Sequence, residues 1–233
     1  MLQAKNLTKK YGNFTALNGL NLSVEAGDIF CLLGANGAGK STTINLFLNF
    51  IDPSEGQATI GSLDVTEYTK ETKQLLSYIP ENLMLYPNLS GLENLDFFCG
   101  LGGKSYTKEQ LEALLKQSGL QPDFIHQRVS SYSKGMRQKV GIALAAAREA
   151  SVLLLDEPTS GLDPKASNEF SELLLSMKEK GVATLMATHD LFRAKDTGTH
   201  IGIMNEGVLV EQFESADVSF QDLEKLYLKH MHN

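Results

Sequence analysis

The stretch GANGAGKS, Gly34 to Ser41, constrains the fold more than any other part of the chain. It follows the apolar run IFCLL and precedes a segment whose apolar residues recur at helical spacing. A glycine-rich loop between a buried strand and a helix can curl so that its N–H groups and the positive helix end face a phosphate. We therefore predict an α/β fold with a phosphate-binding loop. The residues expected around the phosphates are Gly34, Asn36, Gly37, Ala38, Gly39, Lys40, Ser41 and Thr42.

Charged and hydroxyl side chains at this loop and after a second strand predict the chemistry. Lys40 is expected to bridge the terminal phosphates of a nucleotide, and the Ser41 hydroxyl to bind Mg²⁺. The run VLLLDEP places Asp156 at the end of a buried strand, where its carboxylate can also bind Mg²⁺. Neighbouring Glu157 can polarise an attacking water as a general base. The alternative readings are a chance glycine-rich turn and an acidic pair that caps the next helix.

His189 follows a third apolar strand, VATLMAT. In an open parallel sheet, ligands bind beyond the carboxyl ends of the strands, where Lys40 and Asp156 are also expected. His189 is therefore predicted to contact the γ-phosphate and to hold the water. The alternative is a histidine that merely fills the core or the surface.

Strands and helices alternate along most of the chain, which predicts a mostly parallel sheet covered by helices. Residues 1–33 read as short strands joined by turns, and a hairpin is expected around residues 205–207. Pro53 is expected to stop the first helix, and Asp163-Pro164 to start the fourth. Helices are expected over residues 39–51, 91–118, 135–149, 164–180 and 220–231.

Composition excludes several classes of protein. The net charge of the 233 residues is −7. This charge argues against a nucleic-acid partner, because a protein binds nucleic acid through clustered Lys and Arg. Cys31 and Cys99 are the only cysteines and form no disulfide framework. We expect no signal peptide and no membrane span. A function at a membrane would therefore require a partner protein.

Together these motifs resemble the ATP-binding subunits of ATP-binding cassette (ABC) transporters, over roughly residues 2–211. Tyr11 matches the aromatic residue that stacks on adenine in that family. SGLD, which ends at Asp163, matches the loop that crosses its dimer interface. The family signature LSGGQ reads Tyr132-Ser133-Lys134-Gly135-Met136 here. Ser133 and Gly135 retain the hydroxyl and the backbone N–H group that the signature supplies to the nucleotide.

The resemblance implies a RecA-like P-loop core with a mostly parallel sheet, an N-terminal antiparallel β subdomain and an inserted helical subdomain. It implies ATP and Mg²⁺ as ligands, a homodimer or mixed ABC dimer formed on ATP binding, and separate integral-membrane subunits. The chain would then lie on the cytoplasmic face of the membrane. The implied parts of this single domain are a core of residues 1–85 and 149–211, a helical lobe of residues 86–148, and a helical tail of residues 212–233.

The sequence departs from the family pattern at Glu81, where the family usually has a glutamine that approaches Mg²⁺. A carboxylate can still approach the ion, and the alternative is a solvated turn glutamate. With this glutamate and the changed signature, the chain resembles the branch of the family that serves exporters. Leu83 to Phe98 would form the groove for a helix of the membrane partner, although these residues can instead be the core of the lobe.

Two other functions remain open from the residues. A soluble ABC ATPase of translation or DNA repair usually has two cassettes or long insertions, for which 233 residues leave no room. An unrelated phosphate-loop kinase or GTPase is the second alternative. No N-K-x-D motif for guanine is present, and a kinase requires neither the SGLD match nor the signature match.

Overall fold

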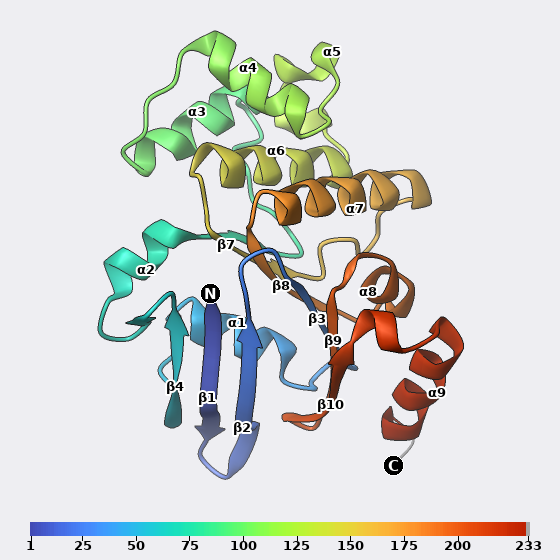
Figure 1. Ribbon diagram of the computed structural model, residues 1–233. Helices are drawn as coiled ribbons and strands as arrows, with labels where there is room; N and C mark the ends of the chain where they lie inside the picture. The colour runs from blue at the N-terminus through green and yellow to red at the C-terminus, as the bar shows by residue number, and fades with distance from the viewer. Residues whose placement is uncertain (232–233) are drawn as a thin grey trace.

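The computed structural model describes residues 1–231 and contains a large and a small β-sheet with helices around them (Figure 1). The strand order of the large sheet is β10-β9-β3-β8-β7-β6. All neighbouring strands are parallel except β9 and β10, which form the predicted hairpin. The strands are β3 (Ile29–Leu33), β6 (Leu76–Ile79), β7 (Val152–Asp156), β8 (Ala183–Thr188), β9 (His200–Asn205) and β10 (Val208–Glu214). The predicted mostly parallel α/β fold is confirmed.

The small sheet is antiparallel and lies at the N-terminal part of the chain, with strand order β2-β1-β4-β5. Its strands are β1 (Leu2–Tyr11), β2 (Phe14–Val24), β4 (Glu55–Ile60) and β5 (Leu63–Asp64). The short strands expected in residues 1–33 are therefore confirmed, and the antiparallel sheet has the place that the family resemblance implies. Strands β4 and β5 complete it from a later part of the chain.

Helix α1 (Lys40–Phe47) lies between the two sheets. Its Ile44 and Phe47 share a buried apolar cluster with residues of both sheets, such as Leu7 and Leu154. The helix ends earlier than predicted, and Pro53 does not end it. Leu48 is the C-cap, and the following residue, Asn49, has the positive φ of 50° that closes many helices.

The opposite face of the large sheet is covered by α6 (Lys134–Ala147), α7 (Pro164–Glu179), α8 (Leu191–Thr197) and α9 (Phe220–Met231). Asp163 is the N-cap of α7, as predicted, and its carboxylate accepts the Ala166 N–H at 2.9 Å. Helix α9 confirms the predicted terminal helix, and residues 232–233 of the implied tail lie outside the described residues.

Helices α3, α4 and α5 pack with α6 around a third apolar cluster, which includes Leu95, Leu115 and Val140. Their bounds are α3 (Gly91–Leu101), α4 (Lys108–Gln117) and α5 (Pro122–Ile125). Capping boxes begin α3 at Ser90 and α4 at Thr107. The remaining elements are α2 (Thr69–Leu75), η1 (Val129–Ser131) and η2 (Ser215–Asp217). Within residues 1–231, no helix combines the length and the apolar character needed to cross a bilayer.

Candidate active site

The glycine-rich loop between β3 and α1 has the backbone geometry that the sequence predicts. Gly37 and Gly39 have φ angles of 85° and 103°, which residues with a Cβ atom rarely adopt. Gly34 is needed for a different reason, because a Cβ there would lie 2.6 Å from the Met204 carbonyl oxygen. The loop ends at α1, whose N-cap Gly39 provides no side-chain hydrogen bond to the first turn. The first turn of α1 therefore has no acceptor from its own N-cap side chain.

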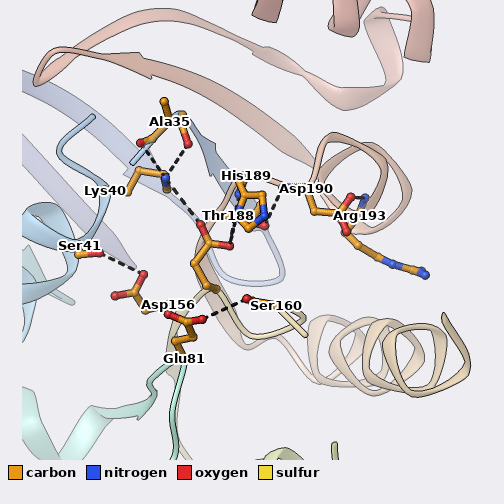
Figure 2. A network of polar contacts seen from close by, with 12 residues as sticks. Ala35, Lys40, Ser41, Glu81, Asp156, Ser160, Thr188, His189, Asp190 and Arg193 are labelled. Carbon is orange, nitrogen blue, oxygen red and sulfur yellow. Dashed lines mark hydrogen bonds and ion pairs between the residues drawn. The ribbon is translucent and has the colours of Figure 1, made fainter. Parts of the chain in front are cut away.

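Lys40 extends its buried side chain back across this loop. Its ammonium donates hydrogen bonds to the carbonyl oxygens of Gly34 at 2.6 Å and Ala35 at 3.1 Å (Figure 2). The same nitrogen lies 3.6 Å from Oε1 of Glu157, and the Lys40 side chain is only 6% exposed. A single positive charge is therefore held at the mouth of the loop beside a carboxylate.

Ser41 and Asp156 face each other across the end of the sheet. The Ser41 hydroxyl donates a hydrogen bond to Oδ1 of Asp156 at 3.3 Å (Figure 2). Burial raises the pKa of the Asp156 carboxyl, and the hydrogen bond from Ser41 opposes this shift. Burial thus disfavours the negative charge of Asp156, and a nearby cation would stabilise that charge.

Glu157 lies between Lys40 and His189. Its Oε2 is 2.8 Å from Nδ1 of His189. The backbone of Glu157 has a positive φ of 46°, which few residues other than glycine adopt. Its Oε1 is buried without a hydrogen-bond partner, apart from the longer ion pair with Lys40. A strained backbone together with a partly unsatisfied buried carboxylate is typical of a functional residue.

Glu81 approaches the site from the end of β6. Its Oε1 accepts a hydrogen bond from the Ser160 hydroxyl at 3.0 Å (Figure 2). The same oxygen lies 3.7 Å from Nζ of Lys134. The sequence did not indicate these contacts, because they join residues far apart in the chain. The Lys134 ammonium therefore lies beside a carboxylate of the same chain.

A pocket of about 360 Å³ joins the phosphate loop to the small sheet. It is lined by Tyr11, Phe14, Ala16, Ala35, Asn36, Gly37, Ala38, Gly39, Lys40, Ser41, Thr42, Glu81, Asp156 and Glu157. Most of the predicted site residues thus line one pocket. Gly34 supports the loop through its backbone, and His189 lines the adjacent pocket of about 340 Å³, which shares Glu157.

Three other predicted residues also lie outside this pocket. Ser133 is the exposed N-cap of α6, where its hydroxyl accepts the Met136 N–H at 3.2 Å. Gly135 is buried in the first turn, and a Cβ there would lie 3.2 Å from Cβ of Ala166. Asp163 is exposed and uses its carboxylate to cap α7. Their predicted contact with a nucleotide would require a nucleotide held outside this pocket.

The side chains present fit a magnesium–nucleotide ligand. Residues 1–231 contain no cluster of three or more His, Cys, Asp or Glu able to hold a metal ion. Nucleotide-bound Mg²⁺ takes only one or two protein carboxylates and completes its shell with phosphate and water oxygens. The oxygens of Ser41, Asp156 and Glu81, all in the one pocket, match that requirement.

Comparisons with known proteins identify the family of the chain. The family model described as ABC transporter matches residues 17–160. The probable multidrug ABC transporter ATP-binding protein YbhF of Escherichia coli is 35% identical over 95% of this chain, which spans 38% of that protein. The linearmycin resistance ATP-binding protein LnrL of Bacillus subtilis is 32% identical, covering 90% of this chain and 68% of its own length. The bacitracin transport ATP-binding protein BcrA of Bacillus licheniformis is 34% identical, with 99% of this chain and 74% of BcrA covered.

Solved structures give the same result. A structure described as the ATP-binding subunit of an ABC transporter has a TM-score of 0.87 and 29% identity, and 99% of each chain is covered. A dimeric ATP-binding cassette bound to ADP and Pi has a TM-score of 0.81 and 26% identity, with 92% of this chain and 99% of the other covered. Because the family model covers more than half of the chain and the relatives exceed 30% identity, the chain belongs to the ABC transporter family, as one of its ATP-binding ATPase cassettes.

Proposed function

We propose that the pocket beside the phosphate loop binds Mg-ATP and hydrolyses it to power transport through separate membrane subunits. The observation that carries this proposal is the meeting of Lys40, Asp156, Glu157 and His189. They follow three neighbouring strands, β3, β7 and β8, whose carboxyl ends share one edge of the sheet. Ligands of open parallel sheets bind at that edge.

Lys40 would leave the loop carbonyls to bridge the β- and γ-phosphates, a contact between opposite charges. Ser41, Asp156 and Glu81 would hold Mg²⁺, which supplies neutralisation of phosphate charge when bound. Tyr11 would stack on the base. Asn36, Gly37, Ala38, Gly39 and Thr42 would surround the phosphates as part of the loop that Gly34 begins.

Hydrolysis would use Glu157 as the general base. The Glu157 carboxylate accepts a proton from water while the water oxygen bonds to the γ-phosphorus and the bond from that phosphorus to the ADP oxygen breaks. His189, 2.8 Å from the same carboxylate, orients it and contacts the γ-phosphate. The buried Oε1 of Glu157, which has no hydrogen-bond donor, supports a role in receiving a proton.

A second copy of the chain, or a related cassette, would complete each site. Ser133 and Gly135 begin α6, so that their N–H groups and the positive helix end can bind an anion. In a head-to-tail dimer they would face the γ-phosphate held by the partner, and Asp163 would lie at the same interface. The dimeric ATP-binding cassette among the solved structures supports the formation of a dimer.

The membrane subunit would dock on a groove beside the helical lobe. The groove has a volume of about 470 Å³ and lies between the segment after β6 and the start of α6. It is lined by Asn82, Leu83, Met84, Leu85, Pro87, Val129, Ser130, Lys134, Arg137 and Gln138. The separate apolar cluster of α3 to α6 supports a lobe over residues 86–148, inserted between core segments 1–85 and 149–211, with residues 212–233 as a tail.

Several relatives are named for multidrug or bacitracin transport or for linearmycin resistance, which supports export as the direction. The chain would then lie on the cytoplasmic face of the membrane. A soluble ABC ATPase that acts on a non-transport partner is the competing function. The two differ in whether a polytopic membrane protein is bound.

Purification of the tagged protein from detergent-solubilised membranes of its own cells tests this function. We expect a polytopic membrane protein to co-purify with the wild type and to be lost from Met84→Glu, because Met84 is 83% exposed in the groove. Phe50→Glu is the matched control, since Phe50 is 61% exposed and does not line the groove. Both variants should keep ATP binding. Equal recovery of the membrane protein with both variants would contradict docking at this groove, and its absence from the wild type would favour the soluble function.

A further inference from the structure

Two aromatic residues close the turn between β1 and β2 at the edge of the nucleotide pocket. Tyr11 and Phe14 are direct cross-strand partners, and Gly12 and Asn13 form the turn between them. Gly12 has a φ of 57°, and a positive φ at the first turn position is what two-residue hairpin turns require. Directly opposite residues project from the same face of a sheet, with Cβ atoms about 4.5–5.5 Å apart. The two rings therefore lie on one side of the hairpin.

Both rings are exposed although they are large and apolar. Tyr11 is 50% exposed and Phe14 is 63% exposed, and both line the pocket that contains the phosphate loop. Ala16, two residues after Phe14 on β2, also lines this pocket. Tyr11, Phe14 and Ala16 thus form a continuous surface, on which the Tyr11 hydroxyl is the only polar side-chain atom.

Lys9 limits how much of Tyr11 a ligand can contact. Its ammonium lies 5.0 Å from the centre of the Tyr11 ring and donates a hydrogen bond to the Asp52 carbonyl oxygen at 2.7 Å. Lys9 covers a part of the Tyr11 ring but is not among the residues that line the pocket. A base that lies against the remaining surface of Tyr11 extends toward Phe14, its neighbour across the turn.

We propose that Phe14 is a second aromatic contact for the nucleobase and that the pair selects purines by ring size. This inference rests on the proposed nucleotide-binding function. Aromatic stacking depends on contact area and tolerates any base, whereas hydrogen bonds to the base edges distinguish adenine from guanine. A surface with one polar atom therefore discriminates little between ATP and GTP. The larger purine ring reaches both aromatic residues, whereas a pyrimidine loses contact with one.

The test measures dissociation constants of the whole protein for ATP, GTP, CTP and tripolyphosphate by calorimetry with Mg²⁺ present. Phe14→Ala should weaken ATP and GTP binding about fivefold or more, as expected for loss of one aromatic–base contact. CTP binding should weaken less, and tripolyphosphate binding should not change, because the phosphate loop is intact. Phe14→Tyr should bind like the wild type. Phe50→Ala is the control, since Phe50 has nearly the same exposure, 61%, and does not line the pocket.

The inference is overturned if Phe14→Ala binds ATP as tightly as Phe50→Ala does. It is also overturned if Phe14→Ala weakens tripolyphosphate as much as ATP, because the effect would then arise at the phosphate loop. A wild-type protein that binds neither ATP nor tripolyphosphate would instead contradict the proposed function itself. Thermal unfolding of each variant identifies a loss of binding that follows from loss of the fold.

Discussion

Lys40→Ala is expected to abolish ATP hydrolysis and to weaken ATP binding by about tenfold or more. The variant loses the only ammonium group seen at the phosphate loop in the described structure, which donates to the Gly34 and Ala35 carbonyls and lies 3.6 Å from Glu157. A hydrogen bond to a charged group contributes about 1.5–3 kcal/mol, and each 1.4 kcal/mol changes an equilibrium constant tenfold. Binding and turnover are measured at fixed Mg²⁺.

Lys165→Ala is the control for this variant, because Lys165 is 82% exposed and pairs only loosely with Glu169. It should retain wild-type binding and turnover. Thermal unfolding of Lys40→Ala separates loss of the ammonium charge from loss of the loop, since the Gly34 and Ala35 carbonyls lose their hydrogen-bond donor. Normal turnover by Lys40→Ala would contradict the assignment of the phosphate-binding loop.

Glu157→Gln is expected to keep ATP binding and to slow hydrolysis by about 10²–10⁴-fold, the usual contribution of a general base. The amide has nearly the same shape as the carboxylate but does not accept the proton of the attacking water. Since hydrolysis is the step that would open the dimer, an ATP-bound dimer should accumulate. Size-exclusion chromatography with and without ATP measures this accumulation, and a single-turnover assay measures the rate.

The control for this variant is Glu224→Gln, at an exposed position of α9. It should remain indistinguishable from the wild type in both assays. A Glu157→Gln protein that stays monomeric with ATP and hydrolyses it at the wild-type rate would assign the base to another residue. Loss of ATP binding would show that Glu157 acts first on the position of Lys40, its neighbour in the ion pair.

The parts of the fold that the sequence predicts are those with a strong local pattern. The loop from Gly34 to Ser41 lies between a fully buried strand and a helix, as its glycine spacing and flanking apolar runs indicate. Asp163 and Pro164 begin α7 because an N-cap carboxylate and a proline at the first position are local signals. The buried run VLLLD is equally local, since parallel strands covered on both faces are apolar throughout.

The features that the sequence missed depend on contacts between distant residues. The end of α1 at Phe47 follows from a left-handed Asn49, and nothing in the apolar spacing distinguishes this end from one at Pro53. Strand β4 joins the small sheet by pairing with β1, across more than 40 residues, and β5 pairs with β4. The contact of Glu81 with Ser160 likewise joins the ends of separate elements.

The residues of the candidate site also divide into those that local sequence predicts and those that depend on distant contacts. Lys40, Ser41, Asp156 and Glu157 belong to motifs recognisable in one chain, so sequence predicts their convergence at the strand ends. Phe14 escaped notice although it lies three residues after Tyr11, because only the two-residue turn makes them neighbours. Ser133, Gly135 and Asp163 are predicted to act on the partner's nucleotide, and that contact is not a property of a single chain.

The central claim is that each ATP site takes Lys40 from one subunit and Ser133 from the other. The measurement is ATP hydrolysis by a mixture of Ser133→Arg and Lys40→Ala subunits, compared with each variant alone. Ser133→Arg alone should bind ATP as a monomer, because its phosphate loop is intact, but neither dimerise nor hydrolyse. Each mixed dimer has one site with both lesions and one with neither, so mixing should restore activity to at most about half of the wild-type value if one intact site turns over. A mixture no more active than its separate components, with a Ser133→Arg monomer that fails to bind ATP, would contradict the account.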